Sequence, residues 1–348
     1  MSQFRYSIFV TLLCLGLAAI WGYNSGGGFS GIWPAVSIAA ILGIMEVSLS
    51  FDNAVVNASI LKEMDDKWRQ IFLTIGILVA VFGMRLLFPI LVVAIATGQG
   101  MVEVSQMAMN QPEVYAEHLH ASHTAIAAFG GTFLFMIFLS FLFDEGKELH
   151  WLGAIEEKLG QLGKIDSIEI IMTLFVLIGL QTYLPLPLEQ KMTMLLAGVS
   201  GLMLYVIVDS AGSFFETEEE EKAIVETAKR NGVMGFIYLE ILDASFSFDG
   251  VIGAFAVTRD IVIIMLGLAI GAMFIRSLTV YLVNKGTLDE YVFLEHGAHY
   301  AIGVLALIMF YSIHQEVPEL FTGLIGVAFI VAAVISSVIY KNKLQEAL

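Results

Sequence analysis

Ten apolar stretches, most of them long enough to cross a bilayer, run along this chain of 348 residues. A transmembrane helix needs about 20 mostly apolar residues, because lipid offers no partner for backbone polar groups. The chain is 58% hydrophobic and only 14% charged, which is far more apolar than a soluble globular protein. These features predict an all-α polytopic membrane protein with about ten transmembrane helices, at residues 6–23, 32–60, 70–97, 121–143, 168–184, 191–211, 232–258, 260–283, 297–314 and 319–340.

The basic residues predict how these helices are oriented. Cytoplasmic loops of membrane proteins carry an excess of Lys and Arg. If the N-terminus is cytoplasmic, only Lys191 and Arg259 of the 17 basic residues fall in outside loops, while Arg85 and Arg276 lie within apolar stretches. We therefore expect both termini in the cytoplasm. The first stretch is expected to remain as a helix rather than to be a cleaved signal peptide, because no clean small-residue cleavage site precedes Asn24.

A polar phrase occurs twice inside these apolar stretches. The residues from Glu46 to Asp52 read EVSLSFD, and those from Asp243 to Asp249 read DASFSFD. We call the two phrases the first and second cassette. An acidic side chain inside a membrane costs at least about 2.5 kcal/mol on insertion scales, so such groups usually mark a functional site. The duplication therefore indicates cation handling rather than packing alone.

The cassettes belong to a longer internal repeat. Two further phrases recur in the same order: residues 76–85 match 267–276, each beginning with Gly and ending with Arg, and residues 120–126 match 296–302. Because five spans separate the copies, they enter the membrane from opposite sides, which is typical of the inverted repeats of secondary transporters. We expect the first repeat half at residues 1–184 and the second at residues 185–348, within one membrane domain that has no separate soluble domain.

The spacing of the first cassette raises a question of helix geometry. A continuous helix turns through roughly 600° between Glu46 and Asp52, so the two acids would not share a face. Two polar stripes would result, one with Glu46, Ser50, Asn53 and Asn57, and the other with Ser48 and Asp52. Either both stripes face protein, or the helix unwinds locally and the acids converge, as at the ion sites of discontinuous helices. We favour convergence.

The cassettes offer carboxylate, amide and hydroxyl oxygens, together with backbone carbonyls if the helix unwinds. Hard divalent cations such as magnesium, calcium and manganese prefer these ligands. The four cassette acids, if ionised, carry four negative charges, and Arg85 and Arg276 return two, a balance that suits one divalent ion. Glu240, one turn before Asp243, is a further candidate ligand. The alternative is that the acids only pair with the two arginines, which we interpret as intramembrane counter-ions, to hold helices together.

Two histidine pairs, His120 with His123 and His296 with His299, have the i, i+3 spacing that places each pair on one face of a helix. Imidazole suits manganese or zinc better than calcium, so these residues are secondary candidate ligands. The alternative is that they lie at span entrances and face the interface. The sequence contains no His-Glu-x-x-His motif, which disfavours a metalloprotease. Cys14 is the single cysteine, so neither an intramolecular disulfide nor a thiolate metal site is expected.

The phrases EVSLSFDN at residues 46–53 and LEILDASFSFDG at residues 239–250 resemble the TerC family of integral membrane proteins, in particular its uncharacterised bacterial branch. That family is similar to the wider lysine-exporter superfamily of transporters. The resemblance implies a protein of the bacterial inner (plasma) membrane and, for several relatives, manganese export. It also implies the metal ligands, which are Glu46, Ser50, Asp52 and Asn53 in the first half-site and Asp243, Ser247 and Asp249 in the second. The second copy departs from the pattern, with Asp243 in place of Glu and Gly250 in place of Asn.

Together these observations predict a transporter, not an enzyme, that exports a divalent metal cation as its substrate. Manganese is favoured, with calcium or another ion as the alternative. Two other classes stay open: a non-transporting membrane scaffold in metal or tellurite stress resistance, and a membrane metal-dependent enzyme. An amino-acid exporter would require a substrate-sized cavity. The expected partners are the lipid bilayer and the metal ion; a homo-oligomer is left open, and nucleic acid is not expected for a chain with a formal net charge of -16.

Overall fold

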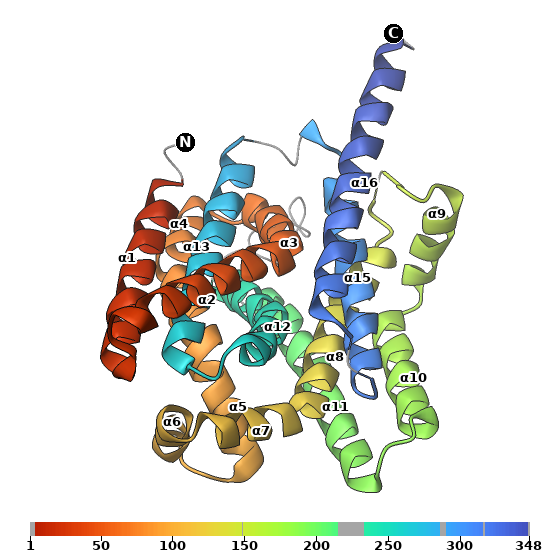
Figure 1. The fold of residues 1–348 in the computed structure, drawn as a ribbon. Coiled ribbons are helices and arrows are strands. Elements are labelled where there is room, and N and C mark those ends of the chain that lie inside the picture. The colour runs from red at the N-terminus through yellow and green to blue at the C-terminus, as the bar shows by residue number, and fades with distance from the viewer. Residues whose placement is uncertain (1–3, 148, 215–232, 286–289, 316, 347–348) are drawn as a thin grey trace. The chain divides into compact units, whose positions relative to one another are not determined.

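The computed structural model describes residues 4–147, 149–214, 233–285, 290–315 and 317–346, and within some helices it describes only the backbone. The described residues form helices and no strands (Figure 1). Six helices are long and apolar enough to cross a membrane, or seven if the helices at 154–164 and 168–183, bent by 100° to each other, form one span. The prediction of an all-α polytopic membrane protein is therefore confirmed. A helix occupies each of the ten predicted ranges, but ten membrane crossings stay a prediction.

The helices cluster into two compact units, each made of two separate stretches of the chain. Unit 1 comprises Met1–Ser122 and Gly235–Lys285, and unit 2 comprises His123–Met234 and Gly286–Leu348. Both cassettes and both Gly-to-Arg phrases belong to unit 1, whereas His123 and the second histidine pair belong to unit 2. The predicted repeat halves at 1–184 and 185–348 follow the order of the sequence instead, and they stay a prediction.

Unit 1 begins with a helical hairpin. In chain order, the elements of unit 1 are α1 (Arg5–Gly22), the π-helical turn η1 (Tyr23–Gly27), α2 (Gly28–Leu49), α3 (Phe51–Glu63), α4 (Asp66–Leu78), the π-helical segment η2 (Val79–Leu87), α5 (Phe88–Thr97), α6 (Met101–Asn110), α7 (Pro112–Ala121), α12 (Val233–Val257) and α13 (Ile261–Lys285). The hairpin consists of α1 and α2. α1 and α2 approach each other so closely at Gly22 that a Cβ atom there would lie only 2.7 Å from Cβ of Ala35. Small residues at such contacts let helix backbones pack tightly in membranes. α13 packs along both helices of the hairpin, and Ser7 Oγ donates a 2.8 Å hydrogen bond to the carbonyl oxygen of Met273.

The helices that carry the two cassettes differ in their continuity. Ser50 separates α2 from α3, and its φ and ψ of -104° and 18° depart from helical values. Backbone hydrogen bonds still cross this position, from Ser50 N to Glu46 O and from Ala54 N to Ser50 O, so the interruption is confined to one residue. α12, which carries the second cassette, is continuous. The first cassette therefore departs from helical geometry at one residue and keeps its backbone hydrogen bonds there, and convergence of Glu46 with Asp52 through local unwinding stays a prediction.

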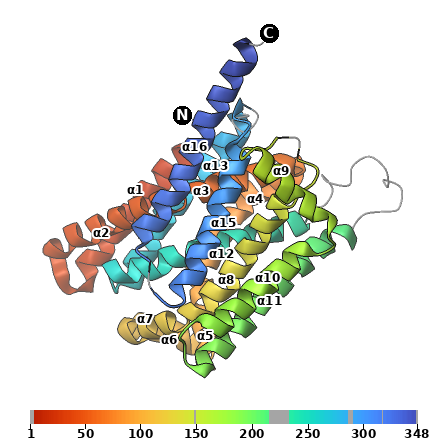
Figure 2. The same ribbon diagram turned by 90° about the vertical axis from the view of Figure 1, so that its right-hand side faces the viewer.

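Unit 2 contains α8 (His123–Leu142), α9 (Ala154–Gly160), the 3₁₀ turn η3 (Gln161–Lys164), α10 (Ile168–Tyr183), α11 (Leu188–Phe214), α15 (Leu294–Ser312) and α16 (Glu319–Glu346). α8 is the central helix and packs against α10, α11 and α15, as Figure 2 shows. Glycines allow two of these contacts. A Cβ atom at Gly201 would collide with the carbonyl oxygen of Phe129, and one at Gly131 would lie 3.2 Å from Met309 Cβ.

Candidate ion site

Arg85 lies between the first acids of the two cassettes. Its guanidinium group donates a hydrogen bond to Oε1 of Glu46 on α2 and forms an ion pair with it, and its Nη1 lies 4.0 Å from Oδ2 of Asp243 on α12. Arg85 is 5% exposed, Glu46 is 1% exposed and Asp243 is 7% exposed. Charged groups so far from solvent are stable only when they are paired and hydrogen-bonded. The fold thus brings one acid from each copy to a single buried cation.

The two copies also contact each other in a crossed pattern. Asn53, at the end of the phrase that begins with Glu46, donates a 2.7 Å hydrogen bond from Nδ2 to Oδ1 of Asp243. Its counterpart in the second copy, Gly250, faces Glu46, and a Cβ atom on it would lie 2.5 Å from Oε2 of Glu46. The longer acid thus faces the residue without a side chain, and the shorter acid faces the amide. The two departures of the second copy from the pattern therefore belong to complementary pairs.

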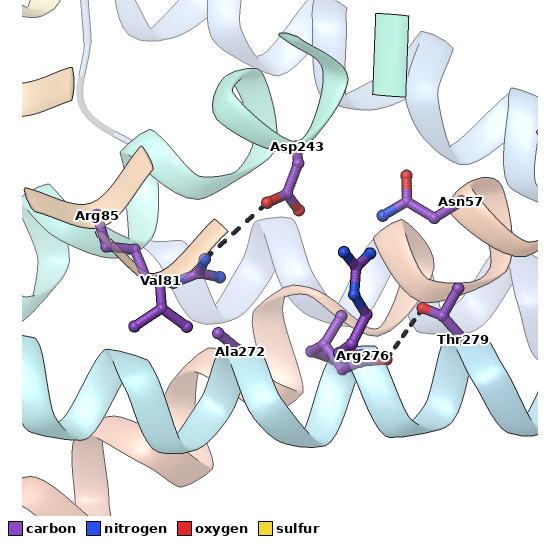
Figure 3. Close-up of a pocket in the computed structure, with 8 residues that line it drawn as sticks. Asn57, Val81, Arg85, Asp243, Ala272, Arg276 and Thr279 are labelled. Atoms are coloured by element: carbon purple, nitrogen blue, oxygen red, sulfur yellow. Dashed lines mark hydrogen bonds and ion pairs between the residues drawn. The ribbon is translucent and has the colours of Figure 1, made fainter. Parts of the chain in front are cut away.

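A small cavity of about 20 Å³ lies beside Asp243 (Figure 3). Its lining residues are Asn57, Val81, Arg85, Asp243, Ala272, Ile275, Arg276 and Thr279. Among the described residues, Oδ2 of Asp243 and Oδ1 of Asn57 have no hydrogen-bond partner. A water molecule needs a cavity of roughly 10–15 Å³. The cavity therefore has room for about one water molecule or one bare ion.

Arg276, the counterpart of Arg85, has a different environment. It donates a hydrogen bond to the carbonyl oxygen of Phe72, and its guanidinium carbon lies 3.6 Å from the centroid of the Phe72 ring. The predicted candidate Glu240 is buried next to this group, since a Cβ atom at Gly76 would meet both Arg276 Nη2 and, at 2.7 Å, Glu240 Oε1. Arg276 therefore makes a backbone and aromatic contact where Arg85 makes an ion pair.

The first polar stripe faces the interior of unit 1. Its members Glu46, Ser50, Asn53 and Asn57 are all buried, and Ser50 Oγ donates a 3.3 Å hydrogen bond to Glu46 Oε1. Ser48, of the other stripe, is exposed and bonds to the carbonyl oxygen of Ile44. The predicted ligands Asp52, Ser247 and Asp249 have side chains that lie outside the described residues, so their roles stay predictions. Among the side chains that are described, no three His, Cys, Asp or Glu residues gather as metal ligands do.

The first histidine pair does not share a helix, which corrects the expectation from spacing. Ser122 ends α7, and its Oγ bonds to the carbonyl oxygen of His118 at 2.8 Å. His120 is the exposed penultimate residue of α7, whereas His123 begins α8 in the other unit. A serine hydroxyl that bonds to the carbonyl oxygen four residues earlier slightly destabilises a helix and often bends it.

The second histidine pair is buried on α15 rather than at an interface. His299 stacks on Phe141, with ring centroids 4.1 Å apart, and His296 contacts the same ring edge-on at 5.2 Å. Nε2 of His296 lies 2.9 Å from Leu149 O, and Nδ1 of His299 lies 2.9 Å from Glu295 O. Because a carbonyl oxygen only accepts hydrogen bonds, both nitrogens must carry a proton. These nitrogens therefore serve structure, and metal binding by the pair stays a prediction.

The sequence reasoning missed a buried carboxylate in unit 2. Glu156 on α9, outside the six apolar helices, is 0% exposed and accepts bonds from Lys147 Nζ at 2.9 Å and from the backbone N–H of Leu152 at 3.1 Å. Nε2 of His296 lies 3.4 Å from it. Burial raises the pKa of Glu156, but the bonds from Leu152 and Lys147 outweigh burial and hold the pKa below its ordinary value. These contacts hold the segment after α8 against α15. In the sequence, this segment was recognisable only as a charged loop, so the burial of Glu156 could not be predicted.

Comparison with known proteins places the chain in a family. An uncharacterised membrane protein of Bacillus subtilis (strain 168), YceF, is 30% identical over 145 residues, which are 38% of this chain and 54% of that protein. This chain thus matches about half the length of that curated relative. No solved structure matches the chain.

The model of a protein family of unknown function, DUF475, matches residues 51–344. This region begins at Phe51, near the end of the first cassette, and includes the whole second cassette. The resemblance to TerC is not confirmed by these matches. The match to the family model covers most of the chain, which therefore belongs to the DUF475 family.

Proposed function

We propose that this membrane protein is a transporter that exports a divalent metal cation, with manganese as the favoured ion. The translocated cation binds between the two cassettes, where the side chains of Glu46, Asp52, Asp243 and Asp249 supply carboxylate oxygens. The proposal includes the orientation inferred from the basic residues, with both termini in the cytoplasm of a bacterial cell.

The observation that carries the proposal is the convergence of Glu46 and Asp243 on one buried position. These acids are 197 positions apart in the sequence, yet both approach Arg85 inside unit 1. Acids that serve only to hold helices together do not have to be duplicated and brought to the same point. In transporters built from repeats, the substrate site lies where the repeats meet, near the middle of the membrane.

The size of the adjacent cavity favours an ion over an amino acid as substrate. The cavity lined by Asp243, Asn57 and Thr279 has a volume of about 20 Å³, enough for about one water-sized particle. Sites for organic ligands are usually about 300–1,000 Å³. Carboxylate, amide and hydroxyl oxygens also line this cavity, which are the ligand types that manganese and other hard cations accept.

The test is the metal content of cells under manganese load. A manganese-sensitive host that lacks its own exporter expresses the wild type, Asp52→Asn, Asp249→Asn, Glu189→Gln or an empty vector, and cell-associated metals are measured by mass spectrometry. We expect the wild type to lower cell manganese and each cassette variant to abolish the effect while remaining folded and inserted, because the neutral amide removes an ionised ligand. Glu189, an exposed acid at the start of α11, serves as the matched control, and Glu189→Gln should behave as the wild type.

Equal manganese and equal content of every other metal in all five strains would contradict the proposal. Normal export by Asp52→Asn or Asp249→Asn would contradict the part of the proposal that assigns transport to paired carboxylates. Purified protein in sealed vesicles provides the direct measurement, since a scaffold moves no ion and a metal-dependent enzyme shows turnover without flux.

A further inference from the structure

We infer that Arg85 is an internal counter-cation, which occupies the space between Glu46 and Asp243 when no metal is bound and is displaced when the transported cation binds. The inference rests on the proposed function and adds a regulatory element to the same site. It assigns different roles to two arginines that the repeat makes equivalent.

The first step is the position of the guanidinium group. Arg85 is hydrogen-bonded to Glu46 and lies 4.0 Å from Asp243. A metal ion bound to both acids would need the same place, because carboxylate oxygens bind manganese-like ions at only about 2.0–2.2 Å. The side chain and the metal are therefore competitors for the acids.

The second step concerns charge. A guanidinium group keeps its proton in proteins, so its positive charge leaves the site only when the side chain moves. Two buried carboxylates without a cation would be strongly destabilised. Arg85 thus stabilises the empty site, and for the same reason it opposes binding of a metal until it moves.

The third step concerns how Arg85 can move. The cavity beside Asp243 borders Arg85 and also borders Arg276, and Figure 3 draws both arginines among its lining residues. Its volume of about 20 Å³ admits only a water-sized particle, so displacement of the larger guanidinium group requires the surrounding backbone to shift as well. Arg85 also lies in η2, a nine-residue π-helical segment. π-Helical turns are rare and are frequently found at functional sites.

The fourth step is the contrast with Arg276. It lines the same cavity as Asp243, but its hydrogen bond goes to the carbonyl oxygen of Phe72 and its guanidinium group lies over the Phe72 ring. Replacing either arginine by glutamine removes the same charge from the same unit. Only replacement of Arg85 removes the group that lies between the two acids.

The experiment measures manganese binding by the purified full chain in detergent. The midpoint of thermal unfolding is followed as manganese chloride is added at constant ionic strength, for the wild type, Arg85→Gln, Arg85→Lys, Arg276→Gln and Glu46→Gln with Arg85→Gln. We expect half-saturation of Arg85→Gln at about tenfold lower manganese than the wild type, a factor that corresponds to about 1.4 kcal/mol. Arg276→Gln also removes a positive charge beside the cavity, so it should tighten binding by a smaller factor than Arg85→Gln, and removal of Glu46 together with Arg85 should abolish the gain.

Arg85→Lys keeps the charge but loses the planar fork that reaches both acids, so it should fold and bind manganese more tightly than the wild type by a smaller factor. It decides the matter if Arg85→Gln does not fold. Unchanged or weaker binding in the Arg85 variants, or equal tightening in Arg276→Gln, overturns the inference and leaves the proposed function in place. If neither the wild type nor any variant binds manganese, magnesium or calcium, the proposed function is overturned, and the inference with it.

Discussion

At the scale of single residues, Gly250 and Glu46 illustrate how the two cassettes fit together. Oε2 of Glu46 lies 2.5 Å from the place that a Cβ atom on Gly250 would occupy, and the carboxylate is held there by Arg85 and Ser50. Across the repeat, Asn53 fills the corresponding place and bonds to the shorter acid, Asp243. The side chain at one position therefore limits the length of the acid at the other.

This complementarity predicts a compensating pair of mutations. Gly250→Asn should destabilise the protein by roughly 1–3 kcal/mol, because the new side chain overpacks a buried position and pushes Glu46 away from Arg85. Glu46→Asp shortens the acid by one methylene group, so the double variant Glu46→Asp with Gly250→Asn should recover much of that loss. Thermal or denaturant unfolding of the wild type, both single variants and the double variant in detergent gives the coupling energy.

Asn53→Gly is the matched control from the other copy. It opens a void and removes the donor to Asp243, so it should also destabilise, but Glu46→Asp should not rescue it because Gly250, not Asn53, limits the space around Glu46. Additive effects of Glu46→Asp and Gly250→Asn would show that the two positions do not limit each other.

At the scale of helices, close contacts in both units depend on glycine. A Cβ atom at Gly201 on α11 would collide with the backbone of Phe129 on α8, so these helices touch through their main chains. A Cβ atom at Gly179 on α10, by contrast, would have no neighbouring atom within 4 Å. Both are helical glycines of unit 2, which makes them a matched pair.

We expect Gly201→Leu to lower the stability of the protein by roughly 1–3 kcal/mol or more, because α8 and α11 must move apart to admit the side chain. Gly179→Leu should be neutral or slightly stabilising, since it meets no neighbour and leucine has a better helix propensity than glycine. The check is the unfolding midpoint of each variant in detergent. Equal effects of the two substitutions would contradict the packing argument.

Helix breaks were the least predictable feature at this scale. The apolar pattern predicted a helix in ten ranges, and each contains one, because apolar length is the main determinant of helices in lipid. The pattern did not predict the end of α7 at Ser122, which assigns His120 and His123 to different helices. It also did not show which serine in the first cassette interrupts the helix. Serines elsewhere make the same i−4 bond inside unbroken helices, as Ser200 does with Leu196, so the position of a break depends on the packing around it rather than on the residue type.

At the scale of the whole molecule, the distribution of basic residues predicts where the loops lie. In the ten-span arrangement both termini are cytoplasmic, and the loop at residues 98–100, after α5, is on the outside because the segments rich in Lys and Arg stay inside. An epitope tag inserted after Gln99 should therefore be accessible to antibody in intact spheroplasts. Tags at either terminus should be accessible only after lysis.

A control for that labelling is a tag after Arg259, in a second loop predicted to lie outside, which should behave as the tag after Gln99 does. Exposure of a terminal tag in intact spheroplasts, or protection of both loop tags, would contradict the ten-span arrangement.

The membrane character of the protein, the positions of its helices and the two cassettes were all readable along the chain. Apolar length and the cost of an acid in lipid are local properties, and a stretch of about 20 residues is enough to reveal them. Helical periodicity also placed Glu46, Ser50, Asn53 and Asn57 on one face, and the structure shows that this face is buried.

Which residues of the two copies meet could be learned only from the folded protein. Arg85 and Arg276 occupy equivalent places in the repeat, yet one bonds to Glu46 and the other to the carbonyl oxygen of Phe72. The contact between Gly250 and Glu46 and the bond from Asn53 to Asp243 likewise join residues from different helices. Contacts of this kind depend on how helices pack and on which partner satisfies each buried charge, and neither follows from periodicity along one helix.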